Sequence, residues 1–277
     1  MNHAKGRGAH RRGAPAAATR RRASCSRRRF ASTLLLLLAG RARADAPAVI
    51  ERLRPSVLPV GSYRVLDSPR FGFRGSGFVV GDGRLLVTNA HVVPEAGAGE
   101  AAPPLQLAAL VPRADGGRDL RLASLERLDR AHDLALLRLE GAPLPALELA
   151  PPGSVKEGEE LLLAGFPIGG VLGYSMVTHR AMLSSITKIA LPSLNAHQLS
   201  ERAAKQLREG PFEVYQLDAT AYPGNSGGPL VAAHDGKVVG VVNMVLVRGT
   251  RESALSNPTG ITYAIPARFV RELLAPP

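Results

Sequence analysis

Gly224-Asn225-Ser226-Gly227-Gly228-Pro229-Leu230 is the most specific stretch of the sequence. Small residues on both sides of Ser226 leave room for a substrate carbonyl to approach its hydroxyl. Glycine also permits a backbone turn that aims amide N–H groups inward. The pattern is typical of a loop that carries a nucleophilic serine. A serine in a glycine-rich hairpin turn is the structural alternative.

A serine hydroxyl becomes nucleophilic when a neighbouring base takes its proton. The histidines beyond residue 44 are His91, His132, His179, His197 and His234. His91 is favoured because it follows the apolar run 85–88, where the chain turns, with the small Ala90 beside it. Asp133 is the favoured orienting acid, since a carboxylate at the head of an apolar run needs a hydrogen-bond donor such as an imidazole N–H.

Short β-rich runs separated by glycine, proline and aspartate fill the chain after residue 47. The first set is Val57–Tyr63, Gly77–Val80, Leu85–Thr88, Leu105–Val111, Leu120–Leu128 and Leu134–Leu139. The second set is Glu160–Ala164, Tyr174–Ile186, Glu213–Leu217, Pro229–Ala233, Val238–Val247 and Ile261–Ile265. Two such sets, split near 141–158, predict an all-β protein in which two barrels pack together.

Helical patterns are confined to three places. Residues 47–54 favour a short N-terminal turn, and residues 266–275 favour a C-terminal helix with one apolar face. Residues 195–209 carry apolar side chains four apart and predict a helix inserted between two strands of the second set. We expect this insertion to pack on the barrel, with a lid or an oligomer contact as the alternative.

Four segments resemble trypsin-like serine peptidases of the HtrA/Deg type. They are Gly75–Val80, Thr88–Val93, Asp133–Arg138 and Gly224–Leu230. The similarity runs through about residues 48–275 in the order found in the family. It implies two six-stranded antiparallel barrels of the chymotrypsin type, the first at about 55–150 and the second at about 158–265. The active site would lie in the cleft between them.

The resemblance also implies a role for each site residue. Ser226 would be the nucleophile, and His91 the general base and then the acid toward the leaving amine. Asp133 would hold the His91 tautomer and stabilise the imidazolium. The backbone N–H groups of Gly224 and Ser226, with Asn225 as a third candidate, would bind the oxyanion.

Substrate specificity is predicted from the same resemblance. The base of the specificity pocket would be formed by Thr220, Ala221 and Tyr222, and another wall by Asn243, Met244 and Val245. None of these residues is acidic, so we expect small or medium aliphatic side chains at P1 and no requirement for arginine or lysine. Asn225 replaces the aspartate with which digestive trypsins bind a newly cut N-terminus. Zymogen activation by that ion pair is therefore not expected.

The positive charge of the chain is confined to its N-terminal leader. The net charge is +12, and residues 1–44 contain 12 of the 35 basic residues and no acidic ones. The remaining 23 basic residues balance the 23 acidic ones, so the body has no electrostatic basis for binding nucleic acid.

The leader has the layout of an export signal. Arginines 27–29 precede the uncharged run 32–40, which is far shorter than the ~20 apolar residues of a membrane-spanning helix. The paired arginines resemble a twin-arginine signal. Ala42-Arg43-Ala44 is an A-x-A cleavage site, so we predict a mature chain of residues 45–277 in the periplasm or secreted, without stable membrane insertion.

The sequence also limits the chemistry of the mature protein. The one cysteine, Cys25, lies in the leader, and no metal-binding motif or cofactor fingerprint occurs. We therefore expect no metal or cofactor. The HtrA/Deg resemblance implies a peptidase of proteins or peptides. Proteins of that type usually continue into PDZ domains, but we expect none here, because the sequence ends at Pro277; the oligomeric state is left open. An α/β-hydrolase esterase is disfavoured because its triad runs Ser, Asp, His along the chain. A catalytically silent binder or chaperone with the same fold remains the alternative.

Overall fold

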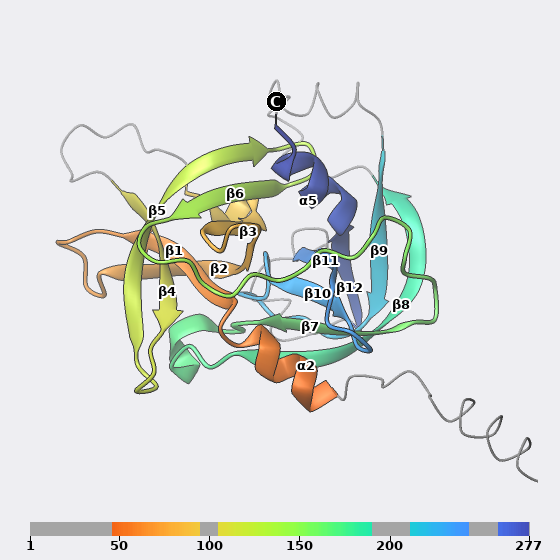
Figure 1. Cartoon of the computed structure of the whole chain (residues 1–277), viewed down its shortest axis with the longest axis horizontal. Helices are drawn as coiled ribbons and strands as arrows, with labels where there is room; N and C mark the ends of the chain where they lie inside the picture. The colour runs from red at the N-terminus through yellow and green to blue at the C-terminus, as the bar shows by residue number, and fades with distance from the viewer. Residues whose placement is uncertain (1–45, 95–104, 190–210, 244–259, 277) are drawn as a thin grey trace, which may run out of the picture. The chain divides into compact units, whose positions relative to one another are not determined.

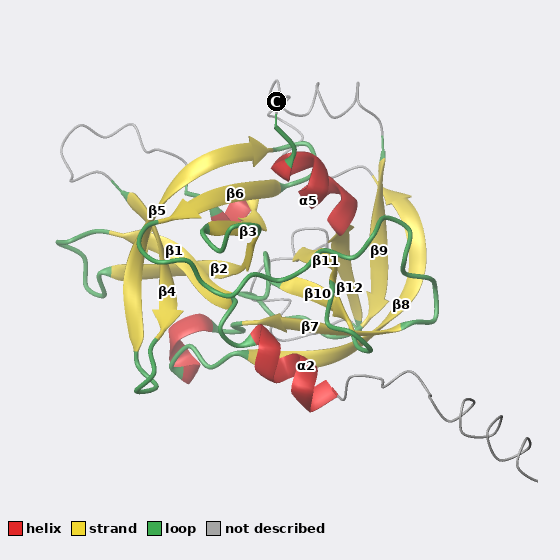
Figure 2. Cartoon of the chain, viewed as in Figure 1, coloured by secondary structure: helices red, strands yellow, loops and turns green. Residues whose placement is uncertain are grey.

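The chain folds into two closed antiparallel β-barrels of six strands each. The computed structural model describes residues 46–94, 105–189, 211–243 and 260–276. In Figure 1 the strands of the first barrel run from orange to green and those of the second from green to blue. Figure 2 shows that strands dominate the described chain. The predicted fold class is confirmed.

The first barrel closes in the order β1-β2-β3-β6-β5-β4. Its strands are β1 (Val57–Tyr63), β2 (Phe71–Val80), β3 (Leu85–Asn89), β4 (Gln106–Pro112), β5 (Arg118–Asp129) and β6 (Leu134–Leu139). The predicted bounds agree within two residues except in β2, which begins at Phe71, six residues before the predicted Gly77. Its glycines lower the β propensity of that stretch, yet a Cβ on Gly77 would lie 2.8 Å from the Val87 carbonyl oxygen. Close packing between the strands therefore requires Gly77, although glycine lowers the β propensity from which the strand is predicted.

The second barrel closes in the order β10-β11-β12-β9-β8-β7. Its strands are β7 (Glu160–Gly165), β8 (Val177–Ile189), β9 (Phe212–Asp218), β10 (Pro229–Ala232), β11 (Val238–Asn243) and β12 (Ile261–Pro266). β8 begins three residues later than predicted, because Tyr174 adopts a left-handed backbone with φ of 57°. The predicted continuation of β11 to Val247 lies outside the described residues.

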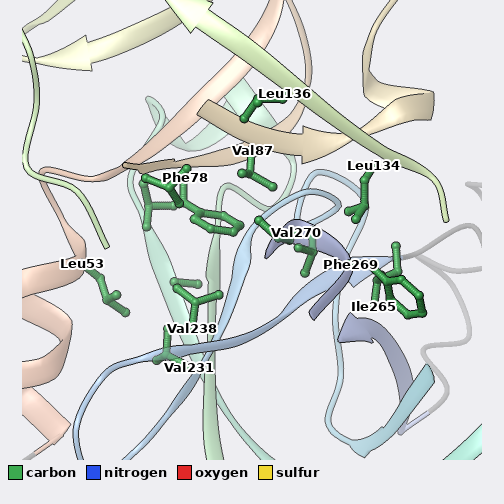
Figure 3. Packing of buried hydrophobic residues seen from close by; sticks show 14 of the residues in the cluster. Leu53, Phe78, Val87, Leu134, Leu136, Val231, Val238, Ile265, Phe269 and Val270 are labelled. Atoms are coloured by element: carbon green, nitrogen blue, oxygen red, sulfur yellow. The ribbon is translucent and has the colours of Figure 1, made fainter. Parts of the chain in front are cut away.

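The interface between the barrels is an apolar cluster. Phe78 and Leu134 reach it from the first barrel, and Val231 and Ile265 from the second, all of them fully buried (Figure 3). Helix α2 (Ala46–Leu53) and helix α5 (Ala267–Leu274) cover this cluster with their apolar faces. The burial of apolar surface thus fixes the first barrel against the second.

Both helices lie close to the bounds that the sequence predicts, 47–54 and 266–275. The helix predicted at 195–209 falls outside the described residues. In the part of the chain that the structure describes, no helix has the length and apolar character that crossing a membrane requires.

Candidate active site

His91 and Asp133 are brought together by the pairing of β3 with β6. The register sets Asn89 at the end of β3 opposite Leu134 at the start of β6. His91 follows in a short 3₁₀ turn, η1 (Ala90–Val92), and Asp133 directly precedes β6. Asp133 Oδ2 lies 2.6 Å from His91 Nδ1, and Asp133 Oδ1 accepts a 2.9 Å hydrogen bond from the His91 backbone N–H.

Both the carboxylate and the backbone carbonyl of Asp133 are held by hydrogen-bond donors. The second barrel supplies a further donor, because the side-chain amide of Asn243 on β11 donates to Asp133 Oδ2 at 2.9 Å. The Asp133 carbonyl accepts from Ala90 N and from Asn89 Nδ2, each at 3.0 Å. The carboxylate is only 4% exposed, so these donors replace the water that it loses on burial.

The contact with Asp133 differs from the role predicted for Asn243. The sequence places Asn243 in a wall of the specificity pocket, but its side chain is fully buried and is directed to the Asp133 carboxylate. Its side chain therefore supports the acid rather than facing a substrate. Met244 and Val245, predicted for the same wall, lie outside the described residues.

The Ser226 loop is docked against the first barrel, on the strands that lead to His91. The Ser226 carbonyl accepts a 2.8 Å hydrogen bond from Ser76 N on β2. A Cβ on Gly227 would lie 2.3 Å from Thr88 Oγ1 and 3.1 Å from Asn89 N, near the end of β3. Ser226 thus lies in the same interbarrel region as the His91–Asp133 pair.

The glycines of this loop are required by backbone contacts. Gly224 has φ of 106°, in the left-handed region, and a Cβ there would lie 2.3 Å from the Phe166 carbonyl oxygen. A Cβ on Gly228 would lie 2.1 Å from the Ala164 carbonyl oxygen. Both contacts exclude any larger residue unless the backbone moves. The glycines that mark the motif in the sequence are therefore explained by its packing.

One of the three predicted oxyanion donors is already engaged. The Asn225 backbone N–H donates to the Tyr222 carbonyl at 3.0 Å, which closes a tight turn before the serine. The prediction that Asn225 contributes to the oxyanion hole is therefore wrong for this conformation. The N–H groups of Gly224 and Ser226 remain the predicted donors.

Ser76 is a positioning residue that the sequence reasoning missed. Its hydroxyl is fully buried, donates to the Gly224 carbonyl at 2.6 Å and accepts from Phe166 N at 3.0 Å. One side chain of the first barrel thus holds two backbone groups of the second barrel in the region of Ser226. Segment 75–77 was identified only as part of a family motif. Its local sequence pattern does not predict the hydrogen bond from Ser76 to Gly224, which lies 148 residues away.

Ser76→Ala is expected to lower turnover by about tenfold, because Gly224 and Phe166 lose their shared partner and the loop shifts. The free energy of unfolding should fall by about 1–3 kcal/mol. Peptidase kinetics and thermal unfolding measure both effects. The matched control is Ser56→Ala, since Ser56 is equally buried but its hydroxyl has no hydrogen-bond partner among the described residues. Equal turnover in the two variants would contradict the role of Ser76.

The other candidate histidines have different surroundings. His132 pairs with Asp129, and His234 lies at the surface 3.6 Å from Asp235. His179 packs beside the Tyr222 ring, and burial lowers its pKa below the ordinary value. His197 lies outside the described residues. Of the histidines that the structure describes, His91 is the one whose ring nitrogen contacts Asp133.

The predicted base of the specificity pocket leads into the Ser226 loop. Ala221 N donates to Thr262 Oγ1 at 3.1 Å, and that hydroxyl donates to the Ala219 carbonyl at 2.7 Å. β12 therefore fixes this segment. Thr220 and Tyr222 are half-buried, whereas Ala221 belongs to the buried core of the second barrel.

Within the described ranges, no group of three or more histidine, cysteine or acidic side chains is arranged to hold a metal ion.

Comparison with known proteins agrees with this arrangement. Residues 75–241 match the model of the trypsin-like peptidase domain. Human serine protease HTRA4 is 31% identical over 234 residues, which cover 82% of this chain and 40% of that protein. The mitochondrial serine protease HTRA2 of Bos taurus is 32% identical over 82% of this chain and 42% of its own length. The chain thus spans about two fifths of the length of these relatives.

Solved structures share the fold. The HtrA-type protease AlgW with a decapeptide aligns with a TM-score of 0.56 and 22% identity, over 83% of this chain and 66% of its own. The inactive form of the Rv3671c protease aligns with a TM-score of 0.55 and 24% identity, over 82% and 90%. Because the family model matches more than half of the chain, the chain belongs to the family of trypsin-like peptidase domains.

Proposed function

We propose that this protein is a serine endopeptidase that cleaves peptide bonds through an acyl-enzyme. The observation that carries the proposal is the 2.6 Å contact between His91 Nδ1 and Asp133 Oδ2, beside a Ser226 loop docked on the same barrel. The names of the relatives, serine proteases HTRA4 and HTRA2, support it.

In the proposed reaction Ser226 Oγ attacks the scissile carbonyl while His91 Nε2 takes the hydroxyl proton. His91 then delivers that proton to the leaving amine, and a water molecule repeats the sequence on the acyl-enzyme. Asp133 keeps the Nδ1–H tautomer in place and stabilises the imidazolium that forms. The amides of Gly224 and Ser226 bind the developing oxyanion.

The substrates proposed are proteins or peptides, including exported or misfolded proteins. The peptide in the AlgW structure is consistent with this class. Small or medium aliphatic residues are proposed at P1, because the predicted pocket residues Thr220, Ala221 and Tyr222 carry no acid to bind arginine or lysine.

A peptide-library cleavage profile of residues 45–277, run beside the Ser226→Ala variant, tests the proposal. Cleavage after aliphatic residues that disappears in the variant is the expected result. Absence of cleavage under every condition, in a folded protein that still binds peptides, would favour the catalytically silent binder. Cleavage restricted to arginine or lysine would overturn the proposed P1 preference while leaving the peptidase assignment in place.

We also propose that the chain is exported through residues 1–44. Arg28→Lys with Arg29→Lys, made in the full chain, is expected to block export, because a twin-arginine signal needs both guanidinium groups. The measurement is the N-terminus and the cell fraction of the product. A mature protein that begins at Asp45 is expected for the wild type only. Arg20→Lys with Arg21→Lys is the matched control, and equal export of both double variants would contradict the proposed signal.

A further inference from the structure

The turn before Asp133 contains a second histidine–aspartate pair. Asp129, at the end of β5, accepts hydrogen bonds through Oδ1 from Ala131 N at 3.0 Å and His132 N at 3.1 Å. Its Oδ2 lies 2.6 Å from His132 Nδ1. Burial alone would raise the pKa of Asp129, but the hydrogen bonds from His132 and Ala131 outweigh it and leave the pKa below the ordinary value. The ionised carboxylate thus anchors His132 to β5.

The other side of His132 is packed against the second barrel. Its ring stacks on Phe269 of α5, with centroids 3.9 Å apart and planes inclined by 23°. Phe212 of β9 meets the same imidazole edge-on at 5.0 Å. The Arg268 guanidinium lies 4.6 Å from the Phe269 ring centroid and is paired with Glu213 at 3.1 Å. His132 therefore joins a turn of the first barrel to β9 of the second barrel and to the C-terminal helix α5.

Asp133, the next residue, has an unusual backbone. Its φ of 55° lies in the left-handed region, which residues other than glycine, asparagine and aspartate rarely adopt. Such a conformation persists where the surroundings over-determine it. Downstream, Asp133 is fixed by β6 and by the donors described above. On the upstream side, Asp133 is attached to His132, whose ring is held by Asp129 and Phe269.

We propose that His132 is a positioning residue for the catalytic acid, holding Asp133 in register with His91 by clamping the turn between Asp129 and Phe269. The inference rests on the proposed function. The contacts that define the position of His132 are with Asp129, Phe212 and Phe269, so its proposed role is to fix the turn and not to take the serine proton. Its effect on the reaction passes through the Asp133 carboxylate.

Three substitutions separate the two contacts of His132. His132→Phe retains the stack on Phe269 and loses the bond to Asp129, whereas His132→Asn retains a donor for Asp129 and loses the stack. Phe269→Leu removes the stack from the other side while preserving an apolar side chain. Each is expected to lower kcat by about tenfold to a hundredfold with KM nearly unchanged, because a misplaced acid affects the reacting groups rather than substrate binding.

His234→Ala is the matched control. His234 is also a histidine beside an aspartate, but its side chain lies at the surface and is 55% exposed. It should retain wild-type kcat. All variants are assayed well below their melting temperatures, so a loss of kcat in folded protein does not reflect unfolding. Equal kcat in His132→Phe, His132→Asn and His234→Ala would overturn the proposal.

A readout independent of turnover distinguishes failure of this inference from failure of the proposed function. The proton shared by His91 Nδ1 and Asp133 should give a downfield NMR resonance in the Ser226→Ala background, assigned by its loss in Asp133→Asn. The His132 substitutions are expected to shift or broaden this resonance, whereas His234→Ala leaves it unchanged. An unperturbed resonance in all His132 variants would refute the positioning role, even if the protein proves to be an active peptidase. A perturbed resonance in a protein without peptidase activity would retain the structural coupling and reject the function.

Discussion

Ser226→Ala is expected to lower kcat for peptide hydrolysis on the order of 10⁶-fold, because no other group in the site replaces the attacking hydroxyl. The fold should persist, since the Ser226 contact with Ser76 is made by its backbone carbonyl, which alanine retains. Casein hydrolysis and thermal unfolding are the measurements. Ser184→Ala, at an exposed position of β8, is the control. Casein hydrolysis by Ser226→Ala at the rate of that control would refute the assignment of the nucleophile.

Asp133→Asn is expected to lower kcat by about 10⁴-fold. Asp133 Oδ2 lies within hydrogen-bond distance of two nitrogens, His91 Nδ1 and Asn243 Nδ2. If the NH₂ group of the asparagine takes the place of Oδ2, it cannot accept from His91 Nδ1 or Asn243 Nδ2. If it takes the place of Oδ1, it cannot accept from His91 N. The substitution therefore favours the wrong His91 tautomer or leaves a buried donor unpaired.

The control for this substitution is Asp82→Asn, which removes a carboxylate at an exposed turn near the surface Arg138. It should retain wild-type kcat. The decisive comparison is kcat in the two variants at equal fraction folded. If Asp133→Asn hydrolyses peptides as fast as Asp82→Asn, Asp133 does not orient the base.

The strands were predictable where apolar alternation and turn residues coincide. β1 and β6 begin and end at the predicted residues, because both are apolar runs with clear boundaries. β2 was predicted too short, since its glycines are selected by close packing against neighbours such as Val87 and not by strand propensity. The start of β8 was misplaced by the left-handed Tyr174, which has no signature in a single sequence.

The sequence could propose site residues only where they belong to short, distinctive segments. Ser226 lies within a glycine-rich run, His91 follows an apolar run, and Asp133 directly precedes another. The roles of Asn243 and Ser76 could not be proposed in this way, because they are defined by partners 110 and 148 residues away that only the packing of the two barrels brings close. Asn225 was assigned to the oxyanion hole because residue order cannot show that its N–H closes a turn with Tyr222.

Labelling with a fluorophosphonate, followed by mass-spectrometric mapping, tests most directly whether the three side chains act as one unit. The mature protein should take up one equivalent, on the peptide that contains Ser226. His91→Ala should abolish the labelling although Ser226 is still present, because the hydroxyl then lacks its base. Labelling at another serine, or labelling of Ser226 at the same rate without His91, would contradict a serine activated by the His91–Asp133 pair.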